Sequence, residues 1–288
     1  MTPSGWTTSP SESLRVGPGF VLTDVDARST PGFEGTKADG ATLIAERGKR
    51  LSDLQEMLYA NGRQGDPRSV LVVLQGMDAS GKGGIARNVL GMVDPQGVHV
   101  TGFGKPTPEE LAHHFLWRIE NALPVAGDIG LFDRSHYEDV LVARVLNLVP
   151  APVWEARYGE INAWEQRLTN HGVVVIKCVM VLSKEEQLER LAARLEDPHK
   201  HWKYSTSDLD DRALWDDYHV AYQAVLDRCT TDAAPWYAVP ADRKWFARLA
   251  VTELLIEALE GMNLAWPVAD FDVEEERARI AQLRTTGG

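Results

Sequence analysis

Apolar runs alternate with amphipathic segments along most of the chain. The clearest run, VVVIKCVMVL at residues 173–182, is nearly continuous and rich in β-branched residues. This composition is typical of a parallel strand that is covered on both faces. Shorter apolar runs predict four further strands, at residues 69–75, 98–103, 128–133 and 236–241.

Between these runs, apolar residues recur at the spacing of an amphipathic helix. The pattern predicts helices at residues 41–60, 85–93, 108–122, 140–146, 153–170, 184–195, 208–228 and 243–261. Asn61 and Gly62 are predicted to stop the first helix, because both residue types favour helix ends. The alternation predicts an α/β fold, a single doubly wound parallel five-stranded sheet with right-handed crossovers.

Three segments stand apart from the regular alternation. Residues 1–40 are rich in Ser, Thr, Gly, Pro and Asp, which predicts an irregular N-terminal arm draped over the body. Residues 41–265 are predicted to form one domain, and its insertion at about 196–230, between the last two strands, is predicted to be a lid. Residues 266–288 are interpreted as a C-terminal tail.

Composition and charge narrow the functional classes. Hydrophobic residues make up 44% and charged residues 25% of the chain, as in an ordinary globular protein. No apolar run approaches a membrane span, the N-terminus does not resemble a secretory signal, and two cysteines favour a reducing cytoplasm. The net charge of −12 argues against a general nucleic-acid or anionic-membrane binder. A local cluster of Lys and Arg can still set the sign of charge inside a cleft.

The stretch GMDASGKGG, residues 76–84, directly follows the strand predicted at 69–75. It matches the P-loop pattern Gly-x-x-x-x-Gly-Lys-[Ser/Thr] except that Gly83 replaces the hydroxyl that normally holds Mg²⁺. The alternative is a glycine-rich turn that binds nothing, but these glycines would weaken the helix unless an anion is bound. The residues expected to surround phosphate groups are Gly76, Ser80, Gly81, Lys82, Gly83 and Gly84.

Two carboxylates offer a replacement for the missing hydroxyl. Asp78 lies within the loop, and Asp133 ends an apolar strand at the position of a Walker-B aspartate. Mg²⁺ prefers oxygen ligands and keeps several waters, so two carboxylates and substrate phosphates suffice to bind it. The alternatives are a turn-forming role for Asp78 and a helix N-cap for Asp133.

Six separated blocks give the chain a family resemblance. They read GMDASGKGG, FGKPTPEEL, HHFLWR, FDRSHYEDVLVARV, DPHKHWKYS and APWYAVPADRKWFARL, and the resemblance covers roughly residues 40 to 265. In this order they resemble the family-2 polyphosphate kinases. The resemblance implies a P-loop kinase-type fold with a helical lid, and transfer of a terminal phosphoryl group between inorganic polyphosphate and a nucleotide with Mg²⁺.

The resemblance also assigns roles to individual residues. It implies that Asp78 and Lys82 are the acid and lysine of the loop, and that Asp133 and Arg134 are the Walker-B acid and its arginine. Glu138, in SHYED, marks members that accept nucleoside monophosphates as well as diphosphates. Further phosphate contacts are expected from Lys105, Arg118, Arg194, Lys200 and Lys203. A solvated surface charge is the alternative for the lid bases, and a plain ion pair is the alternative for Arg134.

Together these observations predict a reversible, Mg²⁺-dependent phosphotransferase. The catalytic residues are expected to be Asp78, Lys82, Asp133 and Arg134, with Asp78 and Asp133 holding the metal. The substrates are expected to be polyphosphate and adenine nucleotides, with guanine nucleotides as an open alternative. A homo-oligomer is expected because members of the family commonly associate. The rival hypotheses are an ATP-dependent nucleoside or nucleotide kinase, a nucleotide-dependent switch ATPase, and a non-enzymatic binder of phosphate chains.

Overall fold

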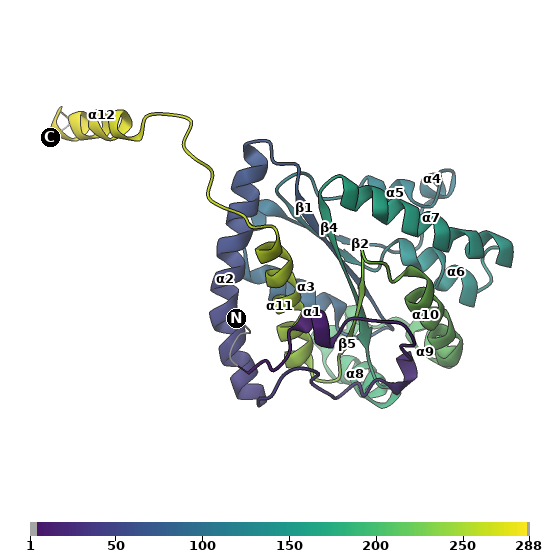
Figure 1. Ribbon diagram of the computed structural model, residues 1–288. Helices are drawn as coiled ribbons and strands as arrows, with labels where there is room; N and C mark the ends of the chain where they lie inside the picture. The colour runs from purple at the N-terminus through teal and green to yellow at the C-terminus, as the bar shows by residue number, and fades with distance from the viewer. Residues whose placement is uncertain (1–4, 287–288) are drawn as a thin grey trace.

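A five-stranded sheet in the order β2-β3-β1-β4-β5 forms the centre of the fold (Figure 1). The computed structural model describes residues 5–286. Every neighbouring pair of strands is parallel, which confirms the predicted doubly wound α/β fold. The strands are β1 (Ser69–Gln75), β2 (Val98–Gly102), β3 (Ile129–Asp133), β4 (Val173–Val181) and β5 (Trp236–Pro240), each within one residue of its predicted ends.

Helices cover both faces of the sheet because each central strand is apolar on both sides. Val70, Val72 and Leu74 of β1 pack into one core, whereas Leu71 and Val73 pack into the other. The first core is covered by α2 (Lys37–Arg63), α3 (Lys82–Val89) and α11 (Lys244–Gly261). The second is covered mainly by α7 (Ala151–Asn170) and α10 (Trp215–Cys229).

The remaining helices include α8 (Lys184–Glu196), which matches its predicted range of 184–195 within one residue, and several short ones. The others are α1 (Pro10–Ser13), α4 (Pro108–Leu111), α5 (Trp117–Glu120), α6 (Val142–Val145), α9 (Ser207–Ala213) and α12 (Val273–Thr286). The prediction of one helix over 108–122 is wrong, because the chain breaks between α4 and α5, where His113 stacks on Trp117. The helix predicted over 208–228 is likewise interrupted at Leu214.

Helix α2 is longer than predicted at both ends. It starts at Lys37 because Thr36 and Asp39 form a capping box, in which each side chain accepts from the other's backbone N–H. The predicted stop at Asn61 and Gly62 is wrong, because the helix continues to Arg63. A Cβ on Gly62 would stand 2.4 Å from the Cα of Gly127. This glycine therefore serves a close backbone contact rather than a helix end.

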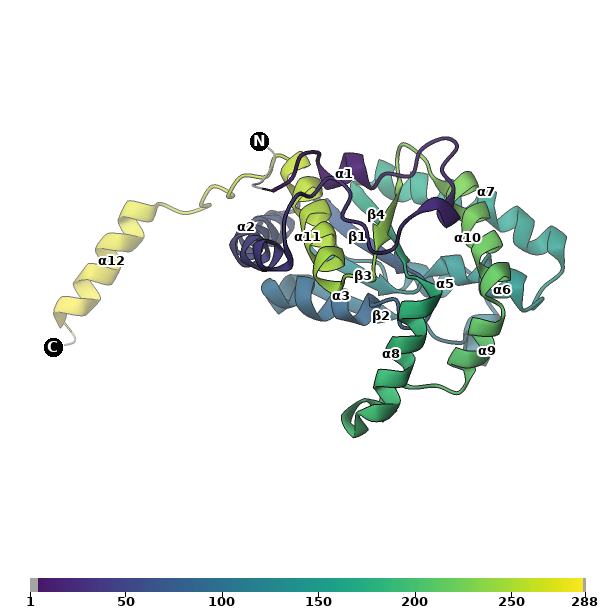
Figure 2. The same cartoon turned by 90° about the horizontal axis from the view of Figure 1, so that it is seen from below.

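Both terminal segments have a defined course. The N-terminal arm buries Trp6, Leu14, Val16, Leu22 and Phe33 against the body. It also extends the sheet at the β5 edge, where the Val16 N–H donates to Trp236 O and the Ala238 N–H donates to Leu14 O. The C-terminal tail ends in α12, a helix that the sequence pattern did not predict and that stands away from the body (Figures 1 and 2).

The segment between β4 and β5 projects from the carboxyl end of the sheet. Helices α8 and α9 form its two sides, and a 3-10 helix at Pro198–Lys203 joins them at the tip (Figure 2). Helix α10 instead packs into the second core through Trp215, Tyr222 and Leu226. Among residues 5–286, no helix combines the length and the apolar character that crossing a membrane requires.

Candidate active site

The GMDASGKGG loop joins β1 to α3, and its backbone turns sharply. Gly76 and Gly81 have φ angles of 150° and 107°, a region that favours glycine. A Cβ on Gly76 would stand 2.9 Å from the carbonyl oxygen of Met180. A Cβ on Gly83 would lie 3.8 Å from Asp133 Oδ2, so the place of the missing hydroxyl is beside that carboxylate.

Lys82 opens α3 and bends back over the loop. Its Nζ donates to Gly76 O at 2.7 Å and to Met77 O at 3.4 Å. Burial lowers the pKa of Lys82, and the carboxylates of Asp133 and Asp78 oppose that shift. Lys82 therefore lies among the groups that the sequence assigned to phosphate and metal.

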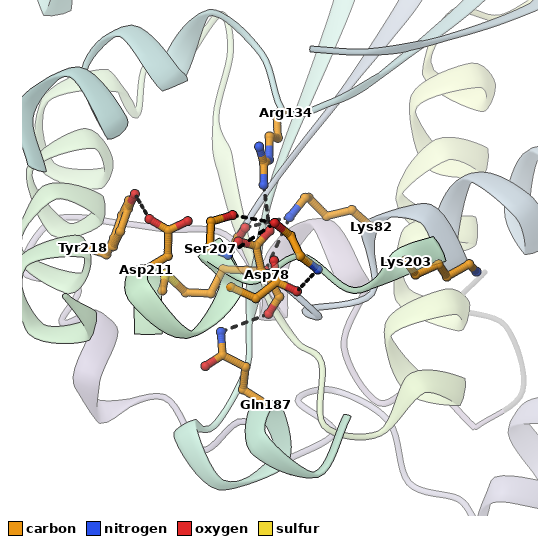
Figure 3. A network of polar contacts seen from close by, with 12 residues as sticks. Asp78, Lys82, Arg134, Gln187, Lys203, Ser207, Asp211 and Tyr218 are labelled. Carbon is orange, nitrogen blue, oxygen red and sulfur yellow. Dashed lines mark hydrogen bonds and ion pairs between the residues drawn. The ribbon is translucent and has the colours of Figure 1, made fainter. Parts of the chain in front are cut away.

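Asp78 lies at the centre of a polar network (Figure 3). Its Oδ1 accepts from Arg134 Nη2 at 2.7 Å, and its backbone oxygen accepts from Gln187 Nε2 at 3.0 Å. Arg134 has a left-handed φ of 64°, which is uncommon for a residue with a side chain. Burial lowers the pKa of Arg134, but Glu138 and Asp78 raise it more, so the net shift is upward. The guanidinium is thus charged and aimed into the site.

The carboxylates of Asp78 and Asp133 line one cavity and both act on Lys82. No group of three or more His, Cys, Asp or Glu side chains suited to a metal occurs within residues 5–286. A divalent ion at this site would therefore be held by two carboxylates and would complete its shell with phosphate oxygens and water. That donor set fits Mg²⁺, which is commonly bound through one or two carboxylates and substrate phosphates.

Two cavities meet at the loop. The first, of about 360 Å³, has apolar walls that include Met77, Phe103 and Leu141, together with three basic and four acidic side chains. The second, of about 1010 Å³, is more open, and seven basic and five acidic side chains line it. Asp78 and Arg134 line both cavities, so they stand where one opens toward the other.

The predicted basic residues divide between the two cavities. Lys105 and Arg118 line the first, and Arg118 also donates to Gly104 O at 2.9 Å. The basic residues lining the second cavity are Lys82, Arg134, Arg190, Arg194, Lys200, Lys203 and Lys244.

Four of these bases, Arg190, Arg194, Lys200 and Lys203, lie on the projecting segment. Arg194 pairs with Asp208 at 2.9 Å and Lys200 pairs with Asp197 at 2.8 Å. Lys203 lies over the ring of Trp202, which is 79% exposed. Arg194 and Lys200 are therefore partly neutralised by their own neighbours.

Several residues at the site were missed by the sequence reasoning. Arg190 on α8 donates to the backbone oxygens of Ala79, Ser80 and Ala241, so it clamps the P-loop onto the end of the sheet. Lys244 opens α11, and burial together with nearby cations lowers its pKa. Tyr218, Tyr222 and Asp211 close one side of the first cavity. Lys244 lies within the APWYAVPADRKWFARL block but was not singled out there, and the other four residues lie outside the six family blocks, so spacing carried no signal for them.

Glu138 gives a test of the electrostatics of the site. Burial raises its pKa above the ordinary 4.5, and Arg134 and Lys82 only partly oppose the rise. The folded state therefore binds this proton more tightly than the unfolded chain does. The stabilisation contributed by the protonated Glu138 carboxyl is full below pH 4.5 and is lost as the pH rises through the folded pKa. We expect Glu138→Gln to be more stable than the wild type at pH 7, with the difference vanishing in acid.

Denaturant unfolding of both proteins between pH 4 and 8 measures this difference. A variant that is less stable than the wild type at pH 7 would contradict the interpretation.

Comparison with known proteins decides the family. The sequence profile described as "Polyphosphate kinase 2 (PPK2)" matches residues 35–266. The chain belongs to the polyphosphate kinase 2 family. It is 45% identical over 248 residues to the AMP/ADP-polyphosphate phosphotransferase of Meiothermus ruber, covering 86% of this chain and 91% of that protein. It is also 41% identical over 254 residues to the ADP-polyphosphate phosphotransferase of Rhodopseudomonas palustris, covering 84% and 86%.

A crystal structure of polyphosphate kinase 2 from Arthrobacter aurescens has the same architecture. It is 52% identical, superposes with a TM-score of 0.95, and the match covers 98% of this chain and 100% of that one.

Proposed function

We propose that this protein transfers the terminal phosphoryl group of inorganic polyphosphate to ADP and also to AMP. The observation that carries the proposal is the meeting of two unlike cavities at Asp78 and Arg134. The first cavity combines apolar walls with a few charged side chains, which suits a nucleotide. An open cavity lined by many Lys and Arg side chains suits a chain of phosphates, because such a chain offers charge and no base.

In the proposed reaction, the two substrates approach the same point from opposite cavities. A terminal phosphate oxygen of the nucleotide attacks the terminal phosphorus of polyphosphate in line. The bridging P–O bond to the next phosphate breaks, so the nucleotide gains one phosphate and the chain loses one. Arg134 and Lys82 neutralise charge on the oxygens in transit, which is the main requirement of phosphoryl transfer. Closure of the projecting segment would exclude water and suppress hydrolysis.

Mg²⁺ is part of the proposal, held by Asp78 and Asp133. Bound there, it would neutralise phosphate charge and polarise the phosphoryl oxygens. The Asp78 carboxylate is held by Arg134 and the Lys82 ammonium is held by loop carbonyls. These are contacts that incoming phosphates can replace.

The nucleotide range is proposed from the names of relatives. The Meiothermus ruber protein is named for AMP and ADP, and the Rhodopseudomonas palustris protein for ADP. The test offers AMP, ADP, GMP and GDP separately to the purified protein with polyphosphate and Mg²⁺, and identifies the products. We expect ADP from AMP and ATP from ADP. If no nucleotide is phosphorylated, the proposal fails.

An ATP-dependent nucleotide kinase is the rival on the same fold. It would consume ATP without polyphosphate and would leave the cations of the second cavity without a role. Omitting polyphosphate from the assay while supplying ATP and AMP separates the two hypotheses.

We further propose a homo-oligomer that uses the C-terminal segment, and a cytoplasmic location, which the two free, buried cysteines support. Isolated helices as short as α12 are marginal in water, so a helix away from its own body calls for a partner surface. Phe271 and Ile280 are more than half exposed on this segment. We expect removal of residues 270–288 to lower the molar mass measured by light scattering after gel filtration. An unchanged mass would contradict this role.

A further inference from the structure

A buried ion pair lies beneath the turn that follows β3. Lys177 Nζ, on the central strand β4, is 2.6 Å from Glu165 Oε2 on α7. The side chains of the two residues are 0% and 1% exposed. Every other residue of the strand segment VVVIKCVMV is apolar, so Lys177 is the exception within it.

This pair is bonded directly to the turn. Lys177 Nζ also donates to Tyr137 OH at 2.9 Å and to Cys229 O at 2.7 Å. Tyr137 OH donates in turn to Glu165 Oε1 at 2.8 Å, and His136 Nε2 lies 3.3 Å from the same oxygen. Burial raises the pKa of Tyr137, which keeps its hydroxyl available as the donor. Two consecutive side chains of the turn are therefore tied to one carboxylate.

Residues 133–139 send their side chains in two directions. Asp133, Arg134 and Glu138 line the two cavities, whereas His136 and Tyr137 are 0% exposed and reach the buried pair. The ion pair thus contacts the buried side of the turn, and the charged side chains of the same turn face the cavities on its other side. Any shift of His136 or Tyr137 would move Arg134 and Glu138 as well.

Stability alone is a weak reason for this arrangement. A buried ion pair is often no more stabilising than well-packed apolar side chains of similar volume. Arg134 also has a left-handed backbone, and such strained residues persist only where the surrounding structure holds them. The turn around Arg134 therefore needs neighbours that hold its backbone in place. The Lys177–Glu165 pair is hydrogen-bonded to Tyr137 of this turn and can do so.

We propose that Lys177 and Glu165 are positioning residues for phosphoryl transfer, which act by fixing the turn that carries Arg134 and Glu138. The inference rests on the proposed function of the site. It predicts that loss of the pair lowers kcat more than it raises KM, because Arg134 acts mainly on the phosphoryl group in transit. Substrate binding depends on many other contacts in the two cavities.

The test replaces both partners at once, in a Lys177→Met/Glu165→Met variant that leaves no unpaired buried charge. We expect kcat for ATP formation to fall at least about tenfold with KM for ADP and polyphosphate changed less than about threefold. Arg47→Met/Glu253→Met is the matched control, since it removes an ion pair with a fully buried carboxylate that joins α2 to α11. The control is expected to keep the wild-type kcat.

Tyr137→Phe is a second variant that keeps the ion pair but removes its hydroxyl link to the turn. This variant tests the proposal even if the double variant does not fold. Its kcat is also expected to fall below that of the wild type. Hydrogen exchange at residues 134–139 should speed up in both variants and not in the control, whether or not the wild type is active. Folded variants with wild-type kcat and exchange would overturn the proposal. An inactive wild type would instead overturn the proposed function.

Discussion

Replacing Asp78 by asparagine is expected to lower kcat by about a hundredfold to a thousandfold, as when one preorganised electrostatic group is removed from an active site. Asparagine keeps the size of the side chain but removes the negative charge that we propose holds Mg²⁺. It also removes the ionic partner of Arg134, which lies 2.7 Å from Asp78 Oδ1. KM for polyphosphate should change little, because the cations of the second cavity remain.

Steady-state ATP formation from ADP and polyphosphate measures this effect. Asp53→Asn, on the exposed face of α2, removes the same charge far from the loop and should leave turnover unchanged. Polyphosphate binding by Asp78→Asn should persist in a direct binding measurement. If the Asp78→Asn variant turned over at the wild-type rate, Asp78 would have no part in the chemistry. A protein that only binds phosphate chains would behave in that way.

Replacing Lys82 by methionine is expected to reduce kcat by a similar factor, about a hundredfold to a thousandfold. The side chain is buried, and its Nζ donates to loop carbonyls from which we expect it to turn toward phosphate. Methionine keeps the hydrophobic stem but cannot neutralise a phosphate oxygen. Because burial lowers the pKa of Lys82, the folded state disfavours its charged form, so loss of the ammonium should not lower stability at pH 7.

Two measurements separate a catalytic effect from unfolding in this variant. Its thermal unfolding temperature should be no lower than that of the wild type, although its kcat is strongly reduced. Lys49→Met, on the exposed surface of α2, is the matched control for the loss of one lysine. Wild-type kcat in Lys82→Met would rule out the proposed role of the P-loop lysine.

The strands and the phosphate loop were predictable because their signals are local. Each strand is a short apolar run, and each was placed within one residue of its ends. The glycines of GMDASGKGG and the aspartate that ends β3 follow strands directly, so their place at one edge of the sheet follows from the parallel topology. Asp78 and Asp133 were expected to hold one metal ion, and the structure places both in the lining of the same cavity.

The wrong and missing predictions fall where contacts between residues distant in sequence override local conformational preference. Gly62 resembles a helix stop, but its role is set by Gly127, which lies 65 positions along the chain. Lys177 was predicted only as part of an apolar strand. Its partners Tyr137 and Glu165 come from a turn and a helix that no sequence spacing connects to it. Arg190 binds backbone oxygens of the P-loop from more than a hundred residues away. Contacts of this kind are fixed by tertiary packing and leave no pattern in the sequence.

The most direct test of the account is the position of the divalent ion. Crystals grown with Mn²⁺ in place of Mg²⁺, together with ADP and polyphosphate, would show the metal by its anomalous scattering. We expect a single strong peak in contact with the carboxylates of both Asp78 and Asp133 and with a phosphate oxygen. A metal bound at another place, or carboxylates that point away from one another in the loaded protein, would contradict the proposed metal site.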